Sequence, residues 1–527
     1  MSKNRLLSRP ETATGQRFQS TNEDTISIPT LDGGMNTKSD PADLDNSEFT
    51  VAQNVFIRNQ KVTRRFGISL LSPAKPDSNT IKRLYTAKQY DGTVVQLRFA
   101  QNSIYRRTEG AWIEIVPSAS SILAPANNII STDDRHFFSN NGANVIQEVV
   151  LGSDSYSSLG NAPRYKYITS FYNRIIGANL VGGAPIPIQV GWSGDFNFGE
   201  WDTNVDPSAG FAPLEESQSD YADAITGLFG FANQMIILRE QSIWLANKIP
   251  GTNPFFFFTA VPSVGCDVPN SVQKIPGGIV FYDRRTNSLY SFTIKEGIKD
   301  IGVPIEDSIY ASISDPDKVF SVFDPIELEY KLCCPLQGTN TVRCWTYSFK
   351  NDKMWYDDFD NITSADTVLF EEPTVFIQDL SGNIENLLGN IEDLGPPLVP
   401  TASLWFGRTD GDINIQDEAT VTGFTSIITS KTWTAGKDVD FYIQRLSFTY
   451  QVLASGSFEI QYSKDNQLTW ITHKTVTISS ANIGKRLKVT CAKSIKSRQF
   501  NWRVVSSSGS FSLIDFKAII ESAGYST

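Results

Sequence analysis

Short apolar stretches alternate with polar turns along most of the chain, from about residue 80 to residue 390. Several of them share one pattern, in which an apolar strand leads through a polar turn to a strand with Ile or Leu beside an aromatic residue. The segments NSIYRR, QSIWLA and NSLYSF share this pattern. Hairpin units that recur at roughly forty residues are typical of propeller blades, each of which buries its faces against its neighbours. The pattern predicts a β-propeller of six or seven blades over 76–390, with a large, irregular β-sandwich as the alternative.

The C-terminal part of the chain has a different pattern. Residues 391–435 begin with EDLGPPLVPTASLWFG, whose prolines indicate a boundary, and are expected to be linker strands. In 436–527, segments such as YIQRLSFTYQVL, SFEIQYS and QFNWRVVSS alternate with a period of two. Strands with one buried face predict a β-sandwich or jelly roll here.

The N-terminal part is read as an arm followed by a connector. Residues 1–24 are polar, without periodicity, and are expected to be extended. In the connector, 25–75, Gly33 and Gly34 permit a turn, and Ser47 is placed to cap a short helix over EFTVAQN. VFIRNQKVTRRFG then predicts a hairpin with its turn at RNQK.

Composition supports the predominance of strands. Aromatic residues make up 12% of the chain, beside 36 Gly and 25 Pro. The expected fold class is therefore all-β: a propeller-like repeat domain with an N-terminal platform segment and a C-terminal β-sandwich. A net charge of −11 argues against a nucleic-acid clamp. Because no apolar run approaches eighteen residues and the start lacks an apolar signal region, we expect a soluble protein that is made in the cytoplasm and does not insert into membranes.

The five cysteines show neither CxxC spacing nor an even count, and two are adjacent. This pattern argues against a disulfide framework and against a zinc site, and favours synthesis in a reducing compartment. The cysteines are Cys266, Cys333, Cys334, Cys344 and Cys491.

Candidate chemistry is sparse. The chain has two histidines, His136 and His473, which nearly excludes a His-based metal site or triad, and His136 is expected to be a strand-edge residue. The acidic segment DGDINIQDE lacks the Gly and the Glu of a calcium loop. Adjacent carboxylates do not by themselves span a glycosidase cleft; these pairs are Glu215–Glu216, Asp357–Asp358 and Glu371–Glu372. We therefore predict no catalytic residues, no cofactor, no metal and no enzymatic activity.

One segment, SKDNQLTW, resembles the Asp-box of sialidases, with Gln467 where that motif has Gly. In that family the box is a hairpin turn away from the active site. The segment is therefore expected to be a turn in the C-terminal domain.

The order of these features resembles the tail nozzle, or hub, proteins (tail tubular protein B) of short-tailed bacteriophages. The resemblance begins with a Gly-Gly, an Asn, an Asp-Pro, an acidic helix ending in Ala-x-Asn-Val and an Arg-rich strand ending in Phe-Gly. Residues 225–292 and the segment TSKTWTAGKDVDFYIQRLSFTY follow the family's order as well. The chain departs from compact members by its polar arm and greater length. The residues matched in the first motif are Gly33, Gly34, Asn36, Asp40, Pro41, Ala52, Asn54, Val55, Arg64, Arg65, Phe66 and Gly67.

The resemblance implies a structural protein of the virion tail that forms a homohexameric ring. Its expected partners are the adaptor ring above it, tail fibre, needle or plug proteins, and double-stranded DNA that passes without specific binding. Gly33, Gly34, Asn54, Arg64, Arg65 and Gly67 are expected to form an assembly motif, in which the two arginines pair with carboxylates across a subunit junction. A carbohydrate-active propeller enzyme and a receptor-binding tail module are the alternative functions.

Overall fold

The structure is a computed structural model that describes residues 24–525, apart from 72–74, 102, 109–110, 118–127, 216–222, 252, 314, 371–400, 418–419, 421–422 and 435–438. Almost all of its regular structure is β-strand, and one α-helix, α1 (Glu306–Ser312), occurs in this part of the chain. The all-β prediction is confirmed. Residues 1–23 of the expected N-terminal arm and the proline-rich boundary at 391–400 lie outside the described residues.

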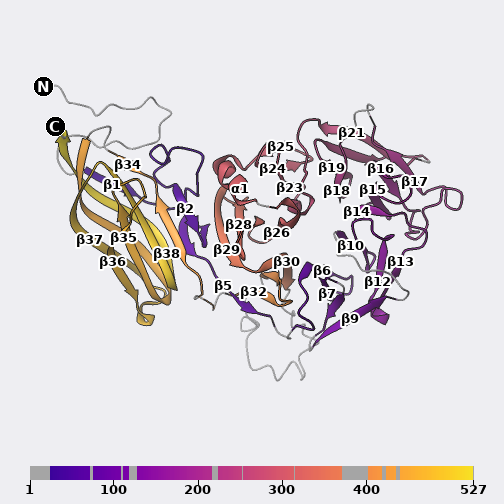
Figure 1. The fold of residues 1–527 in the computed structure, drawn as a ribbon, viewed down its shortest axis with the longest axis horizontal. Coiled ribbons are helices and arrows are strands. Elements are labelled where there is room, and N and C mark those ends of the chain that lie inside the picture. Colours follow the sequence, from indigo (N-terminus) through magenta and orange to yellow (C-terminus); the bar gives the residue numbers. More distant parts are fainter. Residues whose placement is uncertain are drawn as a thin grey trace, which may run out of the picture.

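Seven four-stranded blades surround a common axis (Figure 1). Blades 1 and 2 are joined at their outer edges, where β13 pairs in parallel with β9. The strands of blades 1 to 3 are β6 (Ile81–Lys88), β7 (Val94–Ala100), β8 (Ile104–Arg107) and β9 (Trp112–Pro117); β10 (Asn128–Thr132), β11 (Arg135–Ser139), β12 (Gln147–Val150) and β13 (Ser155–Ser158); and β14 (Tyr165–Ser170), β15 (Ile175–Leu180), β16 (Ile186–Trp192) and β17 (Gly210–Pro213). Those of blades 4 to 6 are β18 (Ile225–Gly230), β19 (Gln234–Arg239), β20 (Ile243–Lys248) and β21 (Phe255–Val261); β22 (Gln273–Ile275), β23 (Gly278–Asp283), β24 (Ser288–Thr293) and β25 (Gly297–Asp300); and β26 (Phe320–Asp324), β27 (Glu329–Pro335), β28 (Thr341–Ser348) and β29 (Lys353–Asp360).

Blade 7 is assembled from both sides of the propeller sequence. It contains β30 (Ile362–Phe370), β31 (Thr401–Arg408), β32 (Ile413–Asp417) and, at its edge, β5 (Gly67–Leu70). The propeller therefore begins at β5 and ends at β32, and not at 76 and 390 as the sequence pattern indicated. An N-terminal strand that completes the last blade closes the ring by hydrogen bonds between segments far apart in the chain.

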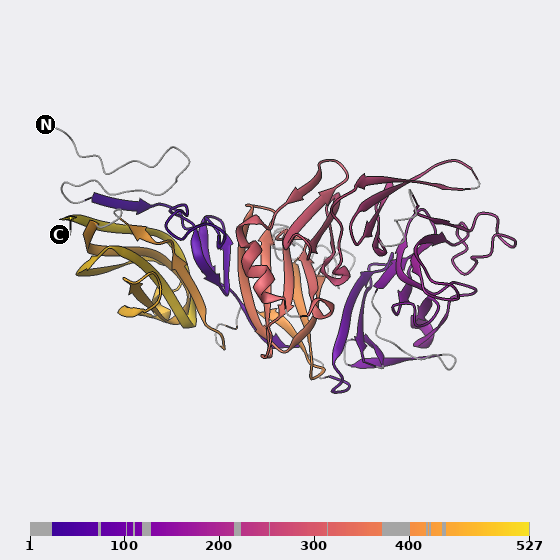
Figure 2. The ribbon, with the colours of Figure 1, turned by 45° about the horizontal axis from the view of Figure 1, so that its top comes forward.

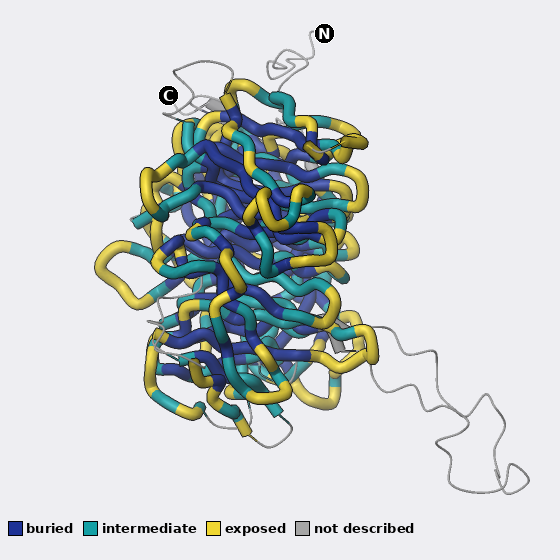
Figure 3. Tube along the Cα trace, turned by 90° about the vertical axis from the view of Figure 1, so that its right-hand side faces the viewer, coloured by how far each residue is buried: buried dark blue, intermediate teal, exposed yellow. Residues whose placement is uncertain are grey.

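Aromatic side chains fill the space between blades. Between blades 3 and 4, the ring of Trp192 meets that of Phe255 edge to face, with centroids 5.3 Å apart. The first strands of the blades, among them β6, β26 and β30, contact one another around the axis. Buried residues lie along the interior of the molecule, and many of the exposed ones lie in turns (Figure 3).

The C-terminal domain is built on two very long strands, β35 (Val439–Ser463) and β38 (Gln499–Tyr525). Both bend where Gly456 and Gly509 lie in contact, each with a positive φ that a larger residue avoids. The Trp502 ring contacts both Phe448 and Phe516, with centroids 5.1 and 5.0 Å away. The predicted sandwich is thus present, with one half of each long strand in each layer. The remaining strands of the domain are β1 (Asp24–Ile28), β33 (Ser426–Ser430), β34 (Trp433–Thr434), β36 (Ile471–Ile478) and β37 (Arg486–Ser497).

The connector forms strands where a helix was expected. Phe49–Gln53 is strand β2, followed by the predicted hairpin of β3 (Val55–Arg58) and β4 (Lys61–Arg64). The helix predicted over EFTVAQN is therefore wrong. This segment is a strand because β2 pairs with β29 and β33, which lie more than 300 residues away in the sequence. The described part of the chain contains no helix long and apolar enough to span a membrane.

Candidate functional site

The connector joins the propeller to the sandwich through one continuous sheet. Strand β2 pairs with β29 of blade 6 on one side, at Gln53 and Tyr356, and with β33 of the sandwich on the other, at Ala52 and Ile428. Figure 2 shows β2 to β4 between the two domains, whereas β1 lies along the sandwich, paired with β38. We call residues 33–67 and their contacts in both domains the joint.

Asn54 is the centre of the joint. Its φ of +55° places it in the left-handed region, which Asn tolerates better than most residues. The side-chain Nδ2 donates to the Thr425 carbonyl at 2.7 Å, on the sandwich side. Its Oδ1 accepts from Arg65 Nε and from the Asp358 N–H, both at 2.9 Å, on the propeller side. One amide therefore bridges the two domains.

Arg64 binds the sandwich. Its Nη2 donates to the Phe424 carbonyl at 2.7 Å, its Nε donates to Ser426 Oγ at 3.2 Å, and its Nη1 donates to the Gly509 carbonyl. The side chain is 1% exposed. Burial, together with the neighbouring Arg65, lowers the pKa of Arg64 to about 10.

Arg65 binds the propeller side. It donates to the Phe66 carbonyl at 2.8 Å and to the Asp358 carbonyl at 3.1 Å, and its Nε lies 3.8 Å from Asp357 Oδ1. Both guanidinium groups also lie over the Phe424 ring, at 4.2 and 3.9 Å from its centroid. Burial lowers the pKa of Arg65 to about 10, although the carboxylates of Asp357 and Asp358 oppose this.

A row of buried charges continues from Arg65 into blade 6. Lys331 lies 3.1 Å from Asp357 and 3.9 Å from Glu329, and Arg58 pairs with Glu329 at 2.6 Å. Lys331, Glu329 and Asp357 are each at most 2% exposed. Charges so far from water are retained because positive and negative groups alternate, and removing one leaves its neighbour unpaired.

The prediction that Arg64 and Arg65 pair across a subunit junction is wrong. Both are buried within one protomer, and the acceptors of Arg64 are carbonyl and hydroxyl oxygens. The three glycines of the motif also serve the joint. A Cβ on Gly33 would lie 2.4 Å from the Ser47 carbonyl carbon, one on Gly67 would lie 2.4 Å from Thr420 Cγ2, and Gly34 has a φ of +83°.

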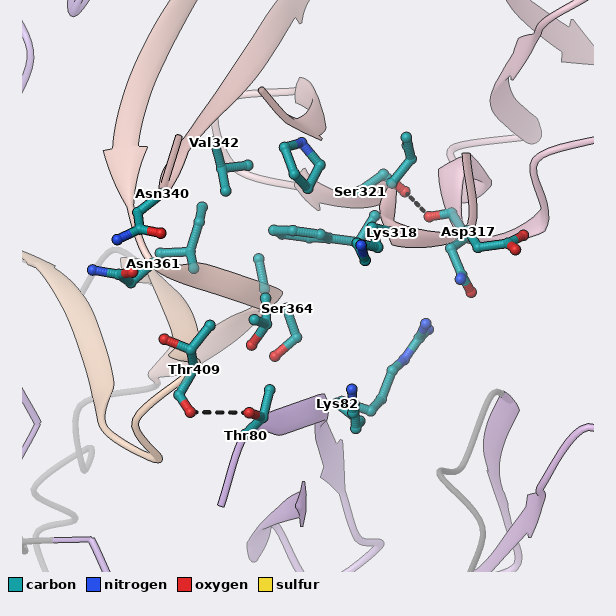
Figure 4. Close-up of a pocket in the computed structure, with 18 of the residues that line it drawn as sticks. Thr80, Lys82, Asp317, Lys318, Ser321, Asn340, Val342, Asn361, Ser364 and Thr409 are labelled. Atoms are coloured by element: carbon teal, nitrogen blue, oxygen red, sulfur yellow. Dashed lines mark hydrogen bonds between the residues drawn. The ribbon is translucent and has the colours of Figure 1, made fainter. Parts of the chain in front are cut away.

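A second candidate site lies on the propeller axis. A cavity of about 520 Å³ opens among the first strands of blades 6, 7 and 1 (Figure 4). A neighbouring cavity of about 430 Å³ extends toward blades 2 to 5, and both are lined by Arg83, Asn270 and Asp317. Volumes of this size are typical of small-molecule sites.

Titratable groups gather beside these cavities. Burial lowers the pKa of Arg83 and raises the pKa of Asp366 to about 7. The attraction between the two charges opposes both shifts. Burial also raises the pKa of Tyr85 to about 12. The Tyr85 hydroxyl donates to Ser131 Oγ at 2.7 Å, and Ser131 is hydrogen-bonded to His136 Nδ1. Sequence reasoning missed this group, because its members come from three blades.

His136 is not the strand-edge residue that was expected. It lies in β11 with 1% exposure, and burial lowers its pKa. The second histidine, His473, contacts the Tyr462 ring. Within the described residues, no three His, Cys, Asp or Glu side chains come together as metal ligands.

The Asp-box segment is a turn, as predicted. Ser463 Oγ donates to Asp465 Oδ1 at 2.6 Å, and the Thr469 N–H donates to the same oxygen at 2.9 Å. Hydrogen bonds from Ser463 and Thr469 lower the pKa of Asp465 to about 2. Gln467, in place of the motif's Gly, has a φ of +71° and accepts from Thr50 of β2, which ties the turn to the joint.

The expectation about cysteines needs a correction. Cys333 and Cys344 form a disulfide across β27 and β28, where they face each other with Cα atoms 4.0 Å apart. Sequence spacing could not indicate this pair, because the register of the two strands brings it together. Cys266, Cys334 and Cys491 are buried thiols.

Of the adjacent carboxylates, Asp357 and Asp358 belong to the joint, with Asp358 paired to Arg343 at 2.9 Å. In DGDINIQDE, Asp410 and Asp412 lie in the turn between β31 and β32, beside Lys75 and Arg408. Glu216, Glu371, Glu372 and Glu418 lie outside the described residues.

No family model matches the chain, and no curated protein does. Among solved structures, the chain is similar to virginiamycin B lyase from Staphylococcus aureus, at 13% identity and a TM-score of 0.39, over 66% of this chain and 98% of that one. It is also similar to the extracellular domain of a putative hybrid two-component system from B. thetaiotaomicron, at 10% identity and a TM-score of 0.39, over 84% and 61%.

These comparisons correct the prediction that the chain is not an enzyme. A lyase is among the proteins with a similar fold, so an all-β chain without familiar catalytic motifs does not exclude catalysis. The low identity assigns no activity to this chain.

Proposed function

We propose that the chain is a tail nozzle protein of a short-tailed bacteriophage, a structural protein of the virion tail. In this proposal six copies form a ring below the portal and adaptor, and the genome leaves through the ring. Tail fibre, needle or plug proteins bind at its far end. The motif from Gly33 to Gly67 and the order of the elements that follow it support the assignment.

The observation that carries the proposal is the joint. A conduit wall needs a subunit whose domains hold a constant orientation, because each copy must present the same surfaces to its two neighbours. Here β2 is hydrogen-bonded to both domains, and Asn54, Arg64 and Arg65 bind main-chain oxygens on either side. The motif that resembles the nozzle family is thus the element that makes the protomer one stiff body.

The route of the DNA follows from the size of the axial cavities. Volumes of about 520 and 430 Å³ are far too small for a duplex, whose major groove alone is about 12 Å wide. In this proposal DNA therefore passes between protomers and not through a propeller. A net charge of −11 is compatible with a lumen that does not retain phosphate.

Measurements on the purified protein and on purified virions test the proposal. Negative-stain images of the purified protein should show sixfold rings with an open centre, and sedimentation velocity should give about six times the monomer mass of 58.5 kDa. Mass spectrometry and immunogold labelling of purified virions should find the chain at the tail. Its absence from virions would refute the proposal, whereas a monomer that is present in virions indicates a ring that forms only on the adaptor.

A propeller that acts on a surface polysaccharide is the second candidate, and the group around Arg83 and Asp366 favours it. An enzyme of this kind should have charged side chains near the propeller axis, as this chain has. Shortening of a purified capsular polysaccharide by the isolated protein, lost in Asp366→Asn, would support this function.

A further inference from the structure

Arg83 occupies an unusual position on the propeller axis. It lines both axial cavities, and burial lowers its pKa. Within the described residues it has no hydrogen bond, and no carboxylate oxygen lies within 4.0 Å of it. Asp366 and Tyr85 act on it only through space. The buried arginines discussed above all have oxygen acceptors, whereas Arg83 is half-buried and has none among the described residues.

The walls of the larger cavity contain further unused polar groups. The side-chain amides of Asn270, Asn340 and Asn361 have no hydrogen bond within the described residues. Ser364 is 3% exposed, and its Oγ is buried without a partner. Figure 4 shows Asn340, Asn361 and Ser364 around the same opening. Of these groups Ser364 is buried, Asn270 and Asn361 are half-buried and Asn340 is exposed. Buried polar groups are normally hydrogen-bonded, so a polar molecule in the cavity would supply the partner that Ser364 lacks and could also reach the amides.

The charge of the cavity is positive. Lys82 and Lys318 line it together with Arg83, against a single lining carboxylate, Asp317. Lys318 already pairs with Asp315 at 3.0 Å, which leaves Lys82 and Arg83 as the cations available to a ligand. A guanidinium binds a carboxylate or phosphate through two parallel hydrogen bonds.

We propose that the axial cavity binds a small acidic sugar, with its carboxylate or phosphate group on Arg83 and Lys82 and its hydroxyl groups on the asparagine amides and Ser364. A free inorganic anion would use the cations but would leave most of about 520 Å³ and the amides unoccupied. A neutral sugar would leave Arg83 without a partner. The inference depends neither on the nozzle assignment nor on catalysis, since binding alone is claimed.

The test is calorimetric titration of the full chain with five probes: glucuronate, galacturonate, glucose 6-phosphate, glucose and inorganic phosphate. We expect the acidic sugars to bind at least ten times more tightly than glucose or phosphate. Arg83→Met should weaken that binding at least tenfold. The matched control is Arg486→Met, an exposed arginine without a partner in the described residues, which makes the same charge change and should not alter binding.

Thermal unfolding of the same variants gives an independent readout. Removing a half-buried cation that has no partner should raise the melting temperature of the ligand-free protein, so Arg83→Met should be more stable and yet bind less. A purely structural role for Arg83 predicts the opposite change in stability. If Arg83→Met does not fold, Ser364→Ala and the salt dependence of wild-type binding replace it.

Equal binding by wild type and Arg83→Met would overturn the proposal, as would the absence of binding by every acidic sugar. Phosphate that binds as tightly as the sugars would overturn the saccharide assignment.

Discussion

Replacing Arg64 with Met should destabilise the protein although it removes a buried charge. In the wild type, Arg64 donates to two main-chain carbonyls and one hydroxyl, at Phe424, Gly509 and Ser426. Methionine has a similar length but no donor, so both carbonyls would be left buried and unpaired. The expected result is a lower free energy of unfolding and a looser contact between β4 and the sandwich.

The size of the stability loss in Arg64→Met follows from contributions of opposite sign. Three hydrogen bonds from a charged donor contribute roughly 5–9 kcal/mol in total, and the contact with the Phe424 ring adds about 1 kcal/mol. Against this, the shift of the Arg64 pKa from 12.5 to about 10 corresponds to a cost of about 3 kcal/mol for holding the charge in the interior. Allowing for partial relaxation and for the apolar contacts of Met, we expect a net loss of about 2–4 kcal/mol.

The assay is urea unfolding followed by tryptophan fluorescence, with Arg486→Met as the control of equal charge change at an exposed site. Arg64→Lys should fall between the two, since an ammonium group keeps the charge but cannot reach all three acceptors. A change below about 0.5 kcal/mol for Arg64→Met, equal to that of the control, would refute the view that these bonds hold the joint.

Two further predictions concern Asp366 and the disulfide. The folded state binds the Asp366 proton more tightly than the unfolded state, because its pKa rises from 3.8 to about 7, so this residue costs stability as the pH rises from about 4 to 7. Asp366→Asn should therefore stabilise the protein by up to about 4 kcal/mol at pH 8 and by less than about 1 kcal/mol at pH 4. Urea unfolding at the two pH values checks this, with Glu296→Gln at an exposed site as the control. An equal gain in stability at both pH values would contradict the prediction. The Cys333–Cys344 disulfide closes a loop with a sequence separation of 11, so replacing both cysteines with Ala should lower the free energy of unfolding by about 2–3 kcal/mol. An unchanged urea midpoint would show that the pair does not constrain the unfolded chain.

Local patterns in the sequence were sufficient for the fold class and for many elements. The alternation of apolar and polar residues predicted strands, the recurrence of hairpins predicted a propeller, and the Asp-box segment predicted a turn. The hairpin at RNQK was predicted correctly as well, with Asn59 and Gln60 at positive φ. These features depend on side-chain periodicity and turn chemistry within a few residues, and such signals are readable without the fold.

Contacts between distant segments decided the rest. The strand β2 replaced an expected helix because β29 and β33 offered it hydrogen-bonding edges, and β5 closed blade 7 from more than 300 residues away. Arg64 and Arg65 were expected at a subunit junction, yet consecutive residues of an extended chain point to opposite sides, and here a domain lies on each side. The axial group of Arg83, Tyr85 and Asp366 has no sequence signal, since its members are brought together only when blades 7 and 1 meet. Local sequence thus determined the strands, hairpins and turns, whereas the pairing of strands far apart in the chain determined the joint and the axial cavity.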